Sequence, residues 1–167
     1  CNNGLINGLE EIQNIMTNLD LLGQNAVSAK YKMQVLSTEE KNSCLTYISQ
    51  CLRDHCDEIL CENQKDINQP VANGMHQGLV DRLKLNKERV FAMAEGLEQI
   101  VTLPDPIGEV LSTNTTPNGL VVNKVRVPLG VIGIIYESRP NVTADAFGLC
   151  FKSGNAVILK GGKDAIN

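Results

Sequence analysis

The stretch that decides the fold is RVPLGVIGIIYESRPNVTADAFGLCFKSGNAVILKGGK, residues 126–163. Two short apolar runs lie in it, residues 131–135 and 156–159, each bounded by Gly, Pro or a charged residue. Runs of this kind are typical of strands that are buried on both faces of an α/β sheet. Residues 140–152 between them can form a short helix, with Gly154 as its C-terminal stop. The pattern predicts a strand, a helix and a second strand of an α/β fold.

Each predicted strand ends in a polar cluster. Tyr-Glu-Ser-Arg-Pro-Asn, residues 136–141, follows the first strand, and Lys-Gly-Gly-Lys, residues 160–163, follows the second. We call these clusters the first elbow and the second elbow. Ligands of open α/β sheets bind outside the carboxyl ends of the strands, so we expect the functional site at the two elbows.

The residues of the first elbow allow two interpretations. Asn141 lies at the predicted start of a helix, where it could cap the helix or direct its amide into a cleft and donate to a developing oxyanion. Arg139 could bind a carboxylate or phosphate group, or it could pair with Glu137 or Asp145. The first elbow by itself does not decide between these roles.

The second elbow is suited to a nucleotide. Its glycines let the backbone approach a ligand, a following helix start favours anionic oxygens, and a lysine adds a positive charge. The spacing fits neither common phosphate loop, because Val157 stands where a Walker A motif requires Gly and no G-x-G-x-x-G occurs. A surface turn with two lysines is the alternative.

Composition excludes several classes of protein. The 167 residues are 43% apolar and 20% charged, with a net charge of −4 and no long charged block, as in soluble globular proteins rather than nucleic-acid-binding ones. No run approaches the roughly 18 apolar residues of a membrane span, and the first residues do not resemble a signal peptide. We expect a cytoplasmic protein that binds neither nucleic acid nor membrane.

The six cysteines predict no metal site and no disulfide. No C-x-x-C occurs, and Cys51, Cys56 and Cys61 recur every five residues in a helical pattern. Each step of five turns the side chain by roughly 140°, so these three thiols fan around the helix. We expect reduced, partly buried thiols, with Cys150 in a packing role.

Two helices precede the decisive stretch. The first is predicted over residues 37–66, where Ser37 and Glu40 match a capping box. The second should begin near Asn86 and end before Pro104. Between them, residues 73–78 are predicted to form a loop, with His76 as a loop residue rather than a catalyst.

Strands and an unusual opening complete the prediction. Residues 120–122 and 124–127 have the β-branched and alternating character of strands, after a turn at residues 117–119. Residues 1–15 are turn-rich and are predicted to be an upstream extension or added sequence, with Met16 as the natural start. The alternative is a genuine first helix through Leu9, Ile12, Met16 and Leu19.

The two elbows, in this order and at this separation, resemble those of the gamma-glutamyl phosphate reductases, also called glutamate-5-semialdehyde dehydrogenases, in the aldehyde dehydrogenase superfamily. The similarity continues upstream through STEEKN at residues 37–42, NGMHQGLVDRL at residues 73–83 and DPIG at residues 105–108. It implies an α/β fold with amino-terminal helices, an antiparallel strand pair and the start of a Rossmann-like NAD(P)-binding sheet. Residues 16–167 would be the amino-terminal part of that domain, with strands at about 120–127 used in oligomerisation.

The resemblance also implies a reaction. The family reduces L-glutamyl 5-phosphate to L-glutamate 5-semialdehyde in proline biosynthesis, through a cysteine thioester and hydride from NADPH. Asn141 matches the oxyanion donor, and Lys160 matches a lysine that reaches the cofactor ribose. A lysine at position 163 favours NADP(H) over NAD, because it can attract the 2′-phosphate. The residues that the resemblance assigns are Arg139 and Ser138 for the substrate, and Lys160, Gly161, Gly162, Lys163, Tyr136 and Glu137 for the cofactor, with no metal.

The resemblance leaves one catalytic group unaccounted for. None of the six cysteines matches the family nucleophile, which lies far beyond the second elbow, so we predict that the chain alone is inactive. Two alternatives stay open: the dehydrogenase part of a bifunctional pyrroline-5-carboxylate synthase, and a truncated, non-catalytic binding or assembly module. A homo-oligomer is expected, with glutamate 5-kinase as a functional partner.

Overall fold

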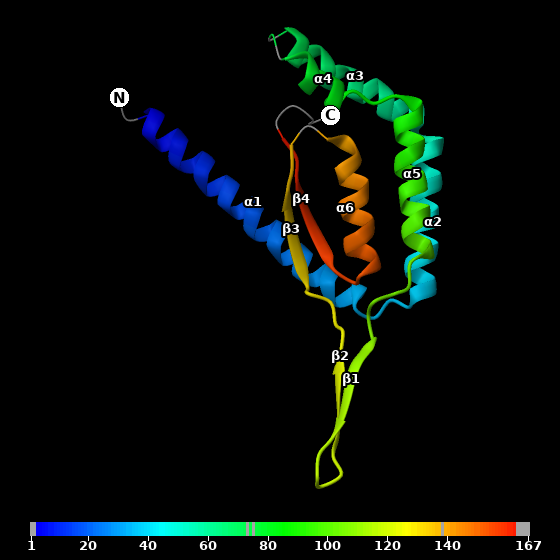
Figure 1. Cartoon of the computed structure of the whole chain (residues 1–167). Coiled ribbons are helices and arrows are strands. Elements are labelled where there is room, and N and C mark those ends of the chain that lie inside the picture. The colour runs from blue at the N-terminus through cyan, green and yellow to red at the C-terminus, as the bar shows by residue number, and fades with distance from the viewer. Residues whose placement is uncertain (1–2, 73, 75, 138, 163–167) are drawn as a thin grey trace.

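We describe the protein from a computed structural model (Figure 1). The structure describes residues 3–72, 74, 76–137 and 139–162, with side chains from Asn18 onward except at residues 69–72. Their elements, in chain order, are α1 (Asn3–Met33), α2 (Thr38–Asp54), α3 (Cys56–Ala72), α4 (Gln77–Leu83), α5 (Lys87–Thr102), β1 (Val110–Thr115), β2 (Val121–Val125), β3 (Val131–Ile135), α6 (Pro140–Lys152) and β4 (Ala156–Lys160). The predicted α/β class is confirmed.

The decisive stretch forms a parallel βαβ unit. β3 and β4 pair in parallel from Val131 opposite Ala156 to Ile135 opposite Lys160, and α6 connects them. Gly154 ends α6 with a φ of +71°, which is strained for residues with a Cβ. Because both strands run in the same direction, their carboxyl ends meet at one edge of the sheet. The two elbows are therefore neighbours, as predicted.

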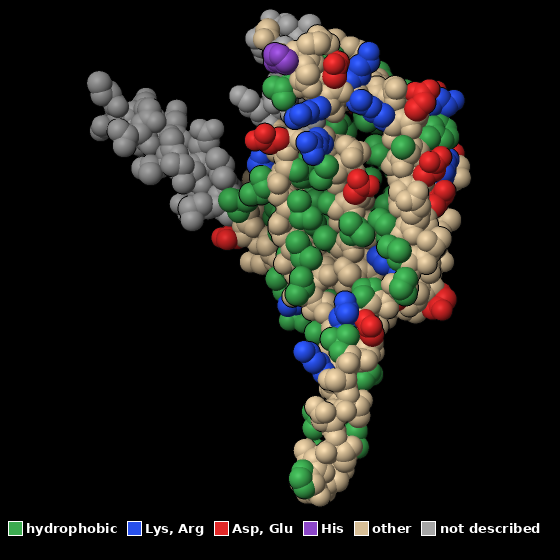
Figure 2. Space-filling view, viewed as in Figure 1, with side chains coloured by type: hydrophobic (Ala, Val, Ile, Leu, Met, Phe, Trp, Pro, Cys, Tyr) green, Lys and Arg blue, Asp and Glu red, His purple; other side chains and the backbone are tan. Residues whose placement is uncertain are grey.

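One prediction for these strands is wrong. We expected β3 to be buried on both faces, but its exposure alternates, with Val131 37% and Ile135 84% exposed. The reason is that, within the described chain, the helices cover the sheet incompletely. Hydrophobic side chains consequently gather over the strands on the face shown in Figure 2.

A helical layer packs beside the sheet. Its core is Leu45 of α2 with Leu97 and Ile100 of α5, and Phe147 and Phe151 of α6 pack against these residues. Gly148 of α6 lies in the same contact. A Cβ built on it would lie 2.7 Å from Leu97 Cδ2 and 2.8 Å from Ile100 Cδ1. The absence of a side chain at Gly148 thus lets α6 approach α5 closely, which fixes the position of the first elbow above α5.

The helix predicted over residues 37–66 is divided in two. Its start is as expected, since Glu40 N donates to Ser37 Oγ at 3.2 Å and Ser37 N donates to Glu40 Oε2 at 2.8 Å. At His55 the chain leaves helical geometry, and α3 begins at the next residue. α2 packs mainly against α5, whereas α3 contacts both α4 and α5.

The remaining helices include one that we did not predict. α5 begins as expected after Asn86, whose Oδ1 accepts from Arg89 N at 2.9 Å. Before it lies the short helix α4, for which His76 is the N-cap: its Nδ1 accepts from Gly78 N at 3.2 Å. At the amino end, α1 runs from Asn3 to Met33, so the opening is helical from Asn3 onward and not turn-rich. That residues 1–15 are an upstream extension stays a prediction.

A hairpin projects from the body of the molecule (Figure 1). β1 and β2 are antiparallel, with Thr115 opposite Val121, and Gly119 closes the turn with a φ of +85°. We predicted two strands at 120–122 and 124–127, but the structure has one strand there, and its partner β1 was not predicted. Every residue of both strands is exposed. Among the helices of the described chain, none has the length and apolar character to cross a membrane.

Candidate functional site

The two elbows share a cavity at the carboxyl edge of the β3–β4 sheet. Tyr136 N donates to Lys160 O at 3.1 Å, which extends the pairing of the strands into the elbows. Beyond this bond lies a cavity of about 450 Å³, which we call the elbow cavity. One wall of this cavity is formed by the two elbows and α6, and the other by α3, α5 and the loop before α5. The first wall consists of Tyr136, Arg139, Pro140, Thr143, Gly161 and Gly162, and the second of Glu58, Ile59, Glu62, Asn63, Asp66, Leu85 and Met93.

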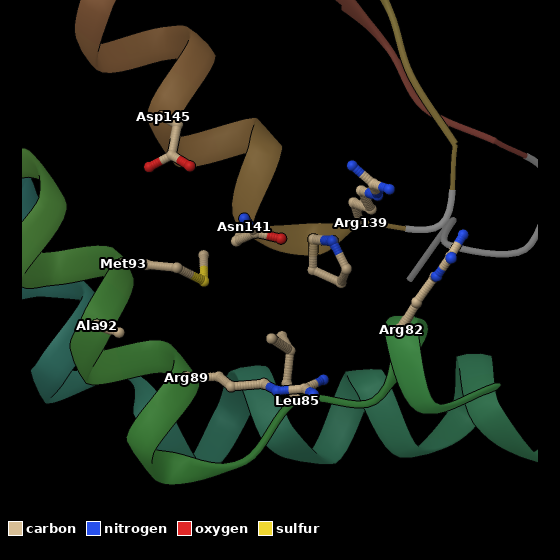
Figure 3. Close-up of a pocket in the computed structure, with 9 residues that line it drawn as sticks. Arg82, Leu85, Arg89, Ala92, Met93, Arg139, Asn141 and Asp145 are labelled. Carbon is tan, nitrogen blue, oxygen red and sulfur yellow. The ribbon is translucent and has the colours of Figure 1, made fainter. Parts of the chain in front are cut away.

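A second cavity, of about 520 Å³, lies between the first elbow and α5, and we call it the arginine cavity. Figure 3 shows the side chains that surround it, which come from α4, α5, α6 and the segments before α5 and α6. They are Arg82, Leu85, Arg89, Ala92, Met93, Arg139, Pro140, Asn141 and Asp145. Arg139 and Pro140 on one wall and Leu85 and Met93 on the other line both cavities, so the two cavities adjoin each other.

Asn141 does not cap α6. The N-cap residue is Arg139, no side chain makes a capping hydrogen bond there, and Pro140 is the first helical residue. The Asn141 side chain is exposed, has no hydrogen-bond partner among the described residues, and lines the arginine cavity (Figure 3). Of the two interpretations of this residue, the capping role is wrong. An uncommitted amide at a cavity wall is able to donate to a ligand.

Arg139 is equally uncommitted. The sequence allowed ion pairs with Glu137 or Asp145, and the structure has neither of them: across the described part of the chain, the Arg139 guanidinium has no ion-pair or hydrogen-bond partner. Asp145 instead lies against α5, where its Oδ1 is 3.4 Å from the position of a Cβ on Gly96. The guanidinium of Arg139 is thus available to a carboxylate or phosphate group.

The residues predicted to bind the cofactor divide into three groups. Gly161, Gly162 and Tyr136 line the elbow cavity, and the Tyr136 hydroxyl lies 2.6 Å from Thr143 Oγ1. Lys160 is exposed, and its Nζ donates to Gly161 O at 2.8 Å. Glu137 lines a third cavity, of about 630 Å³, on the other side of the first elbow. Ser138 and Lys163 lie outside the described residues.

Sequence reasoning missed the opposite wall of both cavities. Arg82 of α4 and Arg89 at the start of α5 contribute two more guanidinium groups to the arginine cavity. Arg82 belongs to NGMHQGLVDRL, residues 73–83, which could have drawn attention to it. The acidic residues of α3 carry no such signal, because they look like the solvated face of an ordinary helix.

The cysteines are placed as structural residues. Cys150 is buried in α6, where burial raises the pKa of its thiol, and it lines none of the three cavities. Cys51 in α2 is half-buried, and in α3 Cys56 is buried and Cys61 is exposed, so the three thiols do not share one helix as predicted. Over the described residues, no group of three or more His, Cys, Asp or Glu side chains is arranged to hold a metal ion.

Comparison with known proteins finds relatives that are enzymes. No protein-family model matches it. It is 54% identical over 146 residues to gamma-glutamyl phosphate reductase of Carboxydothermus hydrogenoformans, an alignment that spans 87% of this chain and 35% of the relative. The solved structure of gamma-glutamyl phosphate reductase from Thermotoga maritima superimposes with a TM-score of 0.83 and 41% identity, covering 85% of this chain and 34% of that one.

A more distant structure shows the wider fold. A probable aldehyde dehydrogenase from Listeria monocytogenes superimposes with a TM-score of 0.62 at 17% identity, covering 94% of this chain and 31% of that one. The predicted aldehyde dehydrogenase-like fold is confirmed. The chain, which spans about 35% of the length of the curated relatives that it matches, is homologous to the corresponding part of the gamma-glutamyl phosphate reductases.

Proposed function

We propose that this chain is the amino-terminal part of an enzyme that reduces L-glutamyl 5-phosphate to L-glutamate 5-semialdehyde with NADPH, in proline biosynthesis. The observation that carries the proposal is Asn141, whose amide has no partner in the described chain and lines a cavity that also contains three arginines. The 54% identity to a gamma-glutamyl phosphate reductase supports the same reaction.

Asn141 is assigned to the oxyanion of the acyl group. When a thiolate attacks the carbonyl carbon of an acyl phosphate, negative charge develops on the carbonyl oxygen, and a preorganised amide donor lowers the energy of that state. We assign the thiolate to another part of the enzyme, because no cysteine of the described residues lines the arginine cavity and the raised pKa of the buried Cys150 disfavours its reactive form. The fragment alone is therefore inactive.

The second elbow is assigned to the cofactor. Gly161 and Gly162 let a ligand approach the backbone at the edge of the elbow cavity, beside the ammonium group of Lys160. Lys163, three residues further along the chain, attracts the 2′-phosphate that distinguishes NADP(H) from NAD(H). Bound NADPH would supply the hydride that reduces the thioester to the aldehyde.

Turnover by a full-length protein that contains this chain tests the proposal. We expect NADPH oxidation that depends on L-glutamyl 5-phosphate, and no turnover by the 167-residue chain alone. Lys163→Glu should shift the ratio of kcat/KM values toward NADH, because a glutamate repels the 2′-phosphate and can accept from ribose hydroxyls. Lys160→Gln is the matched control: it removes a charge at the same elbow and should weaken both cofactors alike. Reduction of the substrate with an unchanged cofactor ratio would contradict the NADP assignment alone.

An assembly role is the second candidate. The exposed strands β1 and β2 are the feature that favours it, since a projecting hairpin with apolar side chains can pair with another copy of the chain. We propose a homo-oligomer in the cytoplasm that works with glutamate 5-kinase, whether the kinase is separate or fused in a bifunctional pyrroline-5-carboxylate synthase. If the reading frame ends at residue 167, a non-catalytic assembly module becomes the better interpretation.

A further inference from the structure

The arginine cavity is lined by more positive charge than a single substrate-binding arginine would provide. Arg82, Arg89 and Arg139 line it from three separate segments, against one acidic side chain, Asp145. The chain as a whole carries a net charge of −4, so this concentration of guanidinium groups is local. The three arginines differ in what their guanidinium groups already bind.

Arg89 is committed to the protein. Its Nη1 donates to Asp81 O at 2.8 Å and also to Lys84 O, which holds the end of α4 against the start of α5. Arg82 and Arg139 are both exposed and, as far as the described residues extend, their guanidinium groups form no ion pair or hydrogen bond. Two of the three guanidinium groups therefore keep all of their donors for a ligand.

Arg82 and Arg139 lie on the boundary of two cavities. Both line the arginine cavity, and both also line the third cavity on the β3 side of the first elbow. Figure 3 shows the two side chains on the same side of Asn141. Paired guanidinium groups match the geometry and charge of a tetrahedral oxyanion better than one group does.

We infer that Arg82 and Arg139 form a clamp for a phosphoryl group, held beside the Asn141 amide. The identity of that group as part of an acyl phosphate rests on the proposed function. In an acyl phosphate the carbonyl oxygen and the oxygen that carries the phosphoryl group are attached to the same carbon, so a site for the phosphoryl group lies next to a site for the carbonyl oxygen. The α-carboxylate of a glutamyl substrate is separated from that carbon by three further carbons.

The clamp has a defined place in the reaction. Attack of the thiolate forms a carbon–sulfur bond and breaks the bond between the acyl carbon and the phosphate oxygen, whose electron pair leaves with the phosphate. The products are a thioester and inorganic phosphate, and no further reactant is needed. Arg82 and Arg139 stabilise the charge that develops on the departing oxygen.

Binding of inorganic phosphate to the 167-residue chain tests the clamp without turnover. The probe is phosphate, followed through the side-chain NMR signals of the arginines, and L-glutamate serves as a carboxylate probe. Arg82→Gln and Arg139→Gln should each weaken phosphate binding about tenfold, and Arg82→Lys should weaken it less because it keeps the charge. Arg126→Gln, which removes a guanidinium paired with Glu109 outside the cavities, should leave phosphate binding unchanged.

Three results would overturn the clamp. The first is that phosphate shows no saturable binding to the unaltered chain, and the second is that the Arg82 variants bind phosphate as tightly as the unaltered chain does. The third is that the substitutions weaken L-glutamate binding as much as, or more than, phosphate binding. The last result would assign the arginines to a carboxylate. Neither Arg82 nor Arg139 makes a described contact that its substitution would remove, so the variants are expected to fold, and thermal unfolding checks this.

Turnover assays of the full-length protein distinguish a failure of this inference from a failure of the proposed function. In the reverse direction, oxidation of glutamate 5-semialdehyde consumes phosphate, and Arg82→Gln should raise the KM for phosphate about tenfold with little change in the KM for the aldehyde. No turnover by the unaltered protein contradicts the proposed function. Turnover with an unchanged KM for phosphate contradicts only the clamp.

Discussion

Asn141 has an uncommitted amide at the start of α6, and its role can be tested at the scale of one residue. In the full-length protein, Asn141→Ala should lower kcat about 10²–10³-fold, as expected for loss of one oxyanion donor. The KM should change little, because the contact strengthens as charge develops on the oxygen.

The stability of the Asn141 variant provides a second readout. The side chain is exposed and caps nothing, so Asn141→Ala should leave the free energy of unfolding nearly unchanged. Asn18→Ala, at an exposed position of α1, is the matched control and should affect neither rate nor stability. A normal kcat for Asn141→Ala would contradict the assignment, whereas a large loss of stability would reassign the residue to folding.

Individual residues of the site differ in how far the sequence could reveal them. Asn141, Arg139 and the glycines of the second elbow follow directly after strands, where the topology of parallel sheets places ligands. Arg82 could not be placed in this way, because it joins the cavity through the packing of α4 beneath the first elbow. Contacts between segments distant in the chain depend on helix packing, which local patterns do not encode.

At the scale of elements, a buried ion pair joins α2 to the segment after α5. Asp105 Oδ2 accepts from Lys41 Nζ at 2.6 Å and from Thr38 Oγ1 at 2.9 Å, and its Oδ1 accepts from Ile107 N at 3.0 Å. The Lys41 side chain is only 3% exposed. Burial raises the pKa of Asp105, but these three donors and the charge of Lys41 outweigh burial and lower it below its usual value.

The lowered pKa predicts the direction of a pH effect. A carboxyl whose pKa is lower in the folded state contributes stability above its unfolded pKa, about 3.9, and loses that contribution as the pH falls through the folded value. Asp105→Asn leaves Lys41 buried without its counter-charge and should cost about 3 kcal/mol at pH 7. Urea unfolding should show this difference shrinking as the pH falls from about 4, the pKa of the unfolded state, through the lower pKa of Asp105 in the folded state. A difference that is constant from pH 7 to pH 3 would contradict the role of the ion pair.

The contact between α5 and α6 makes a second prediction at this scale. Gly148→Ala places a Cβ 2.7 Å from Leu97 and 2.8 Å from Ile100, so it should destabilise the fold by about 1–3 kcal/mol through overpacking. Gly23→Ala in α1 is the control, because nothing lies within 4 Å of its Cβ, and it should stabilise by about 0.5–1 kcal/mol through helix propensity. If both variants gain stability in urea unfolding, the close packing of α6 on α5 is wrong.

The helices and strands show which structural features can be predicted from sequence patterns. Ser37 and Asn86 are local capping signals, and both mark helix starts in the structure. The break at His55 has no local signal, because the helical stripe of apolar residues continues through it. β1 was missed because Ser112, Thr113 and Asn114 make it mostly polar, and its pairing with β2 is what makes it a strand.

At the scale of the whole molecule, two apolar surfaces lack a cover within the described chain: the exposed face of β3 and the projecting hairpin. The face of β3 lies next to the elbows, where further parts of a longer enzyme would pack against the sheet. The hairpin extends away from that site (Figure 1). Its apolar side chains point to both faces, since Val121 and Val122 are neighbours in one strand.

The hairpin is therefore expected to pair with a second copy of the chain through a free strand edge, where backbone groups lack partners. Val121 and Val122 are 57% and 49% exposed, so replacing both with Lys should lower the assembled mass in sedimentation equilibrium by repelling an incoming strand. Asn123→Lys, at the next residue of β2, tests whether one added charge has the same effect, and we expect a smaller effect because this change removes no apolar surface. Because the hairpin does not contribute to the helical core, thermal unfolding of the monomer should be unchanged. An unaltered chain that stays monomeric at high concentration, or an assembled mass that is the same in the Lys variants, would place the oligomer interface elsewhere.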